Sequence, residues 1–229
     1  FPYGSYGLIS RTKGAKTMCV AAVMEVILTA MELYVADQSD ESVWDYLPKR
    51  SWQYLAQRDI KAHLWVNYDI NAKGSAHALR HFGMGINVPF ERLIPGSFVN
   101  VNRTTGTGHA VVFLSFIDNQ GNEYPTYNDD VIGFKYFSSQ GGYDVGYGGL
   151  DYRYAIFEEH CNPAPEMPYK RDLHIIRSDN QHYLNTGVMY HPRYWLPTTW
   201  KTGAFQRSIG NEPVSVFDPV YFDGRTADD

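Results

Sequence analysis

A chain of 229 residues, 44% of them hydrophobic, is long enough to bury a complete core without help from metals or disulfides. Its formal net charge is −5 and it has no run of Lys or Arg, so we expect no nucleic-acid partner. The longest apolar run, from Met18 to Tyr34, is interrupted by Glu25, Thr29 and Glu32. It falls short of the ~20 uninterrupted apolar residues of a membrane helix, and we expect no membrane span.

The first predicted element is a buried helix over residues 16–34, KTMCVAAVMEVILTAMELY. The three polar residues that interrupt it follow at i, i+4 and i+7, so they form one narrow stripe on an otherwise apolar helix. Thr17 is a suitable N-cap, which places Cys19 in the first turn, where backbone N–H groups and the helix dipole favour a thiolate. Cys19 is therefore a candidate nucleophile. The alternatives are a small buried hydrophobe, or half of a disulfide with Cys161, a residue that fits better as a semi-buried thiol.

Four polar residues between 61 and 88 are candidates for a metal site or for a different catalytic site. A strand is predicted over residues 61–70, and a helix from about Ser75 to the glycines at 83–85. His77 and His81 are spaced i, i+4 on that helix, but without the Glu of the metalloprotease pattern they fit better as polar-face residues, and we expect no metal. His63 and Asp69 would supply a transglutaminase-like Cys-His-Asp site, which is a minor alternative for Cys19.

A central strand is predicted after the turn at residues 104–108. Beginning at His109, the residues HAVVFLSF are apolar on both faces, which is typical of a strand inside a sheet. His109 and Val111 share one face, whereas Ala110 and Val112 share the other. As the first residue of this strand, His109 should lie at the rim of the sheet.

The returning strand of the same hairpin is predicted over residues 131–142. If the midpoint of the hairpin lies between Tyr124 and Pro125, His109 faces Gln140, and cross-strand partners point to the same face. A polar side chain there would fix the tautomer of the imidazole while its other nitrogen serves a nucleophile. Ser138 lies on the same face as Gln140 and is the reserve candidate, whereas Ser139 should face the other way.

These motifs resemble those of the papain-like NlpC/P60 and CHAP superfamily of bacterial cell-wall cysteine peptidases and amidases. The resemblance covers residues 14–150 and is carried by the Cys19 helix, the turn LIPGSFV, the strand GTGHAVVFLSF and the strand end YFSSQ. It implies an α+β papain-like fold, in which the N-terminal catalytic helix packs on an antiparallel sheet. It also implies that Cys19 attacks an amide carbonyl, His109 is the base, and Gln140 orients the histidine.

The same resemblance implies the biological setting. The substrate would be a peptidoglycan stem peptide, cleaved through a thioester without a cofactor, and the protein would be secreted or periplasmic. Some members of the superfamily are effectors that one bacterium delivers into another, and they have a dedicated inhibitor or immunity protein. A different class of function is a non-catalytic cell-wall or glycan-binding module, because the 18 Tyr and 5 Trp residues could stack on sugars.

Composition divides the chain near residue 160. The Pro-rich segment NPAPEMPYKRD at 162–172 is followed by short aromatic pieces without sustained helical period. We therefore expect a hydrolase core over residues 1–160, and a C-terminal extension or small lobe over residues 161–229 that packs on it.

Overall fold

The structure is a computed structural model that describes residues 19–46, 74–81, 83–103, 108–140, 149–156 and 181–195. Its helices are α1 (Cys19–Gln38), η1 (Glu41–Tyr46), α4 (Ser75–His81), η2 (Phe90–Arg92) and η5 (Pro192–Tyr194). Its strands are β1 (Gly85–Asn87), β2 (Phe98–Arg103), β3 (Gly108–Ile117), β4 (Glu123–Tyr124), β5 (Gly133–Gln140), β6 (Gly149–Ile156) and β7 (Gln181–Met189).

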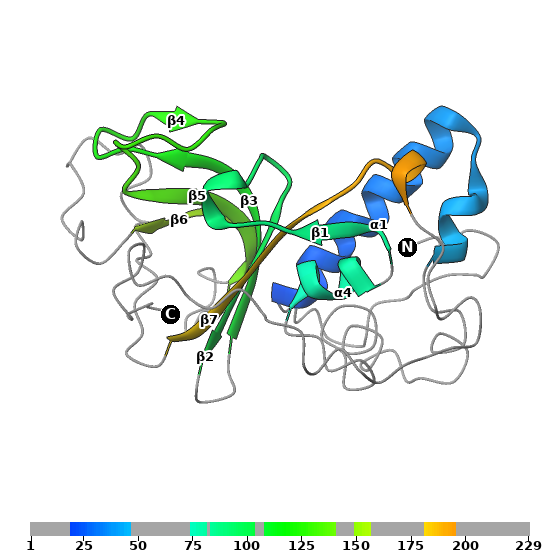
Figure 1. Cartoon of the computed structure of the whole chain (residues 1–229), viewed down its shortest axis with the longest axis horizontal. Helices are drawn as coiled ribbons and strands as arrows, with labels where there is room; N and C mark the ends of the chain where they lie inside the picture. The colour runs from blue at the N-terminus through cyan, green and yellow to red at the C-terminus, as the bar shows by residue number, and fades with distance from the viewer. Residues whose placement is uncertain are drawn as a thin grey trace.

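The described residues form an α+β fold built on one seven-stranded sheet. The strands lie side by side in the order β1-β7-β2-β3-β5-β6, with β4 paired to β3, and every ladder is antiparallel. In Figure 1, α1 and α4 lie on the same side of β2 and β3. The expected α+β class with an antiparallel sheet is thus confirmed.

Helix α1 packs on the sheet through one apolar stripe. Its fully buried residues are Ala22, Val23, Ile27, Leu28 and Met31. The helix stops where Ser39 adopts a left-handed backbone (φ 54°) and donates its N–H to the carbonyl of Val35 at 2.8 Å. With 20 residues and a mean hydropathy of 1.9, α1 also has the length and composition of a membrane helix. Helices buried in protein cores and signal sequences share these properties, and 28% of the apolar window of α1 is buried, where it contacts β3 and β5.

The two faces of the sheet carry two separate clusters. The α1-side cluster joins the buried stripe of α1 and residues of α4 to Phe98, Ala110 and Val112. The opposite cluster is aromatic and is built around Phe113 and Phe116, whose ring centroids lie 4.7 Å apart. Because side chains alternate along a strand, neighbouring residues of β3 enter different clusters. Both faces of β3 are therefore buried, as its pattern predicts.

The hairpin formed by β3 and β5 has the predicted register at its His109 end. Val112 pairs with Phe137 and Phe113 pairs with Tyr136, which corresponds to a midpoint between Tyr124 and Pro125. Between Phe113 and Ser115 the register shifts by one residue, so one residue of β3 bulges there. The bulge lies toward the turn and leaves the register at the start of β3 unchanged.

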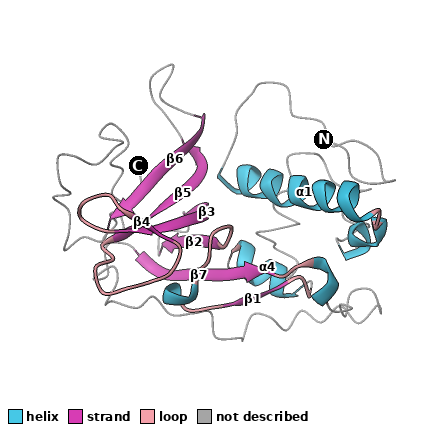
Figure 2. Cartoon of the chain, turned by 90° about the horizontal axis from the view of Figure 1, so that it is seen from above, coloured by secondary structure: helices cyan, strands magenta, loops and turns pink. Residues whose placement is uncertain are grey.

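The sheet crosses the domain boundary that was expected at residue 160. Strand β7 lies between β1 and β2 and pairs with both, so residues 181–189 are an internal strand of the sheet rather than an addition to its surface. Figure 2 shows β7 running among the other strands, next to β2. Composition could not reveal this, because the pairing of β7 is made with strands that precede it by about eighty residues or more.

Candidate functional site

Cys19 is the first described residue of α1. The side chain is partly buried at the border of the α1-side cluster, and it is a thiol rather than half of a disulfide. A helix N-terminus stabilises a nearby anion by about 0.3–1 kcal/mol. That is too little to make the thiolate the main form of a cysteine near neutral pH, so a nucleophile here needs an imidazole partner.

His109 is the second residue of β3, at the rim of the sheet as predicted. Its side chain is 8% exposed, and its ring meets the ring of Tyr136 edge-on, with 5.9 Å between the centroids. Tyr136 belongs to the cluster opposite α1. The imidazole therefore lies on that face of the sheet.

The structure does not bring Cys19 and His109 together on one face. Ala110 packs with α1 whereas Val111 packs in the opposite cluster, so alternation places His109 with Val111 and away from Cys19. The hairpin pattern predicts the strand, its rim residue and its register correctly. It does not predict which face α1 covers, because both faces of β3 are apolar.

The two candidate orienting residues lie on β5. Gln140 is the last described residue of β5, and the observed pairs of β3 and β5 run from Val112 and Phe137 toward the turn. Only a continuation of this register beyond the observed pairs would place Gln140 opposite His109. The side chain of Gln140 lies outside the described residues. Ser138 is fully buried, and its hydroxyl donates to the carbonyl of Ala110 at 2.7 Å. That hydrogen bond ties the hydroxyl to the backbone of β3.

A buried polar group on the Cys19 side of the sheet was not anticipated. Asn185 and Ala110 flank Asn100 on its two neighbouring strands, and Asn100 Oδ1 accepts the backbone N–H of Ser75 at 2.9 Å. Ser75 Oγ is buried and makes no hydrogen bond within the described part of the chain. A Cβ on Gly74 would lie 2.6 Å from Asn185 Oδ1, so only glycine allows this approach. These contacts anchor the start of α4 on the face that α1 covers.

The sequence signal for this group is the alternation in SFVNVNR, which puts Asn100 on the same face as Phe98. An apolar residue is expected at such a position. An Asn at this buried position must find polar partners inside the protein. A polar residue where an apolar one is expected therefore indicates a structural or functional polar group.

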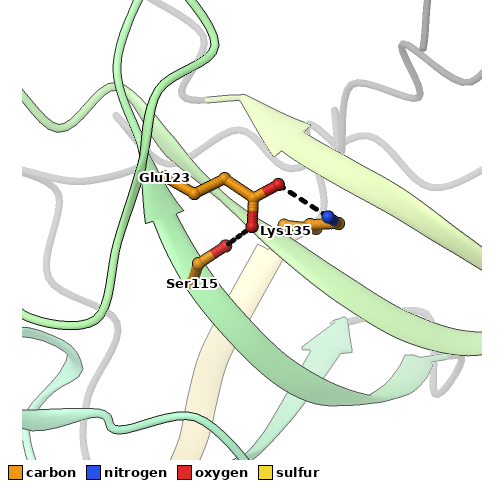
Figure 3. Close-up of polar contacts among 3 residues, drawn as sticks. All are labelled: Ser115, Glu123 and Lys135. Carbon is orange, nitrogen blue, oxygen red and sulfur yellow. Dashed lines mark hydrogen bonds and ion pairs between the residues drawn. The ribbon is translucent and has the colours of Figure 1, made fainter. Parts of the chain in front are cut away.

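Two other polar groups, near the turn of the β3–β5 hairpin, are structural. Glu123 accepts the hydroxyl of Ser115 at 2.8 Å and pairs with Lys135 Nζ at 2.6 Å, which fastens β4 to β3 and β5 (Figure 3). In the adjoining turn, burial acts to raise the pKa of Asp118. Hydrogen bonds from Asn122, Tyr124 and a backbone N–H outweigh it and hold that pKa below 3.8.

Several predicted residues lie outside the described part of the chain. They include Cys161, and also His63 and Asp69 of the transglutaminase-like alternative. His77 and His81 lie on α4, but their side chains are not among those described. No group of three or more His, Cys, Asp or Glu residues suited to a metal ion occurs among the described side chains.

No protein-family model, curated protein or solved structure matches this chain.

Proposed function

We propose that the chain is a cysteine hydrolase that cleaves amide bonds in peptidoglycan stem peptides, with Cys19 as its nucleophile. The observation that carries the proposal is a partly buried thiol at the first described residue of a helix that packs across an antiparallel sheet. The order of Cys19 on a helix, His109 at a strand start and Gln140 at the end of the returning strand is that of the papain-like NlpC/P60 and CHAP superfamily. The fold proposed for the chain is accordingly papain-like.

The proposed reaction has two halves. The thiolate of Cys19 attacks the amide carbonyl, and the first-turn N–H groups of α1 bind the oxyanion. The imidazolium then protonates the leaving amine, and a thioester remains. Water, deprotonated by the same imidazole, hydrolyses the thioester to a carboxylic acid and restores the thiol. Neither half requires a cofactor or a metal.

The identity of the base is a separate part of the proposal. His109 is the first candidate, with Gln140 as its orienting residue and Ser138 in reserve, but its ring faces the cluster opposite Cys19. Helix α4 packs in the same cluster as Cys19 and carries two other histidines, His77 and His81.

A set of single substitutions decides between these bases. Purified muropeptides are incubated with the parent protein and with His109→Ala, His77→Ala and His81→Ala, and the products are identified by mass spectrometry. The variant that lacks the base should lose activity by about 100-fold or more. His191→Ala is the matched control, because His191 is an exposed residue beside η5 whose ring contacts Tyr34. Equal activity in all four variants would contradict imidazole-assisted chemistry.

The remaining parts of the proposal follow from the substrate. Peptidoglycan lies outside the cytoplasm, so we propose a secreted or periplasmic protein that acts on stem peptides and meets an inhibitor or immunity protein there. The absence of product from any muropeptide would contradict both the substrate and the compartment.

A further inference from the structure

An open apolar groove runs between α1 and the edge of the sheet formed by β5 and β6. It has a volume of about 410 Å³. The α1 wall includes Val26, Ala30 and Leu33, and the floor includes Phe137 of β5 and Leu150 of β6.

The large apolar side chains around the groove are unusually exposed. Leu33 is 66% exposed and Leu150 is 52% exposed, and Tyr152, on the same face of β6, is 53% exposed. Apolar side chains that gather around a concave surface are typical of binding sites, whereas scattered ones are not. The groove is therefore suited to a ligand with apolar side chains.

The adjoining backbone determines the shape of that ligand. Strand β6 stands at the end of the strand order, and no strand among the described residues pairs with its outer edge. Its N–H and C=O groups on that side can hydrogen-bond an added strand, as in peptide recognition by strand addition. An extended peptide paired there would direct alternate side chains toward the groove.

The charge of α1 determines the polarity of the ligand. The helix carries Glu25, Glu32 and Asp37 but no Lys or Arg, and Glu25 lines the groove directly. Among the described residues, Glu25 is the one charged residue that lines the groove, so the α1 wall is acidic and complements a basic ligand.

We propose that this groove docks an extended segment of a partner protein in which apolar side chains alternate with Lys or Arg, and that the segment pairs with the outer edge of β6. Cys19 does not line the groove, although Ala22, one helical turn further along α1, does. The proposed binding does not require the proposed hydrolase activity.

The test uses a fluorescent synthetic peptide of alternating Val and Lys, as long as the eight residues of β6, and measures binding by anisotropy. Ala30→Trp fills the groove and should weaken binding by about tenfold or more. Ala36→Trp is the matched control, because Ala36 is an exposed alanine of α1 that does not line the groove. Circular dichroism confirms that both variants are folded.

Two altered peptides test charge and strand pairing without changing the protein. Replacing Lys by Glu should weaken binding by about tenfold or more, and so should N-methylation of alternate backbone amides, which removes donors for strand pairing. Several results would overturn the proposal: no binding of the Val-Lys peptide, equal binding by Ala30→Trp, or equal binding of the altered peptides. A different outcome is that the protein self-associates or binds phosphatidylcholine vesicles through the groove. If Ala30→Trp abolished either of these interactions, the groove would have a different occupant, and the proposal would be overturned.

Discussion

Replacing Gly187 of β7 by Ala should destabilise the protein through a clash that neither neighbour can relieve easily. A Cβ at this position would lie 2.5 Å from the carbonyl oxygen of Ile86 and 2.7 Å from Cβ of Ala76, where ordinary contacts are 3.4–4 Å. The first neighbour is the backbone of β1, and the second is a short side chain buried on α4. Overpacking of this kind costs about 1–3 kcal/mol of unfolding free energy. We expect a loss of about 3 kcal/mol, because one of the two clashing neighbours is backbone and cannot move aside as a side chain can.

The assay is thermal unfolding followed by circular dichroism. For a chain of this length a loss of about 3 kcal/mol lowers the Tm by about 6–12 °C. Ala76→Gly removes one of the two clashing atoms, so the double variant should lose less stability than the two single variants together. Two results together would refute the position of β7 between β1 and β2 and beneath α4. They are a Tm of Gly187→Ala within about 1 °C of the parent, and a loss of stability in the double variant equal to the sum of the losses in the two single variants.

Two further predictions concern the turn and the contacts that hold β4. The folded-state pKa of Asp118 lies below its ordinary 3.8, so its carboxylate adds stability above about pH 4 that is lost as the pH falls through the folded pKa. Asp118→Asn should flatten this part of an acid-unfolding curve, and an unchanged curve would contradict the hydrogen bonds assigned to the carboxylate. Glu123→Ala removes the acceptor of Ser115, whose side chain is largely buried, and should cost about 1–3 kcal/mol in urea unfolding. Glu123→Gln keeps an acceptor and loses only the partly exposed ion pair with Lys135, so it should cost less than about 1 kcal/mol, and equal losses in the two variants would contradict the hydrogen bond.

The parts of the fold that local sequence predicts are those that depend on near neighbours. The apolar pattern with its narrow polar stripe predicts a helix over residues 16–34, and the structure has α1 from Cys19, its first described residue, to Gln38. The turn between β3 and β5 predicts the pairing of Val112 with Phe137. In both cases the determining contacts lie within one helix or one hairpin, where periodicity is informative.

The parts that sequence does not predict depend on distant contacts. Strand β7 enters the sheet between two strands from the first half of the chain, and its own pattern does not identify them. The orientation of His109 depends on which face α1 covers, and β3 is apolar on both faces. The partner of Asn100, the backbone N–H of Ser75, belongs to another element, and the pattern of the strand does not identify it. Tertiary packing decides all three.

The central claim is that Cys19 does chemistry rather than packing, and one substitution separates the two roles. Cys19→Ser keeps nearly the same volume but replaces the thiolate with a far weaker nucleophile. Turnover of muropeptides, measured by mass spectrometry, should fall by about three orders of magnitude or more while the Tm stays unchanged. Cleavage at close to the parent rate by a folded Cys19→Ser protein would contradict the account. A lowered Tm in a chain that never had activity would show that Cys19 is a core residue.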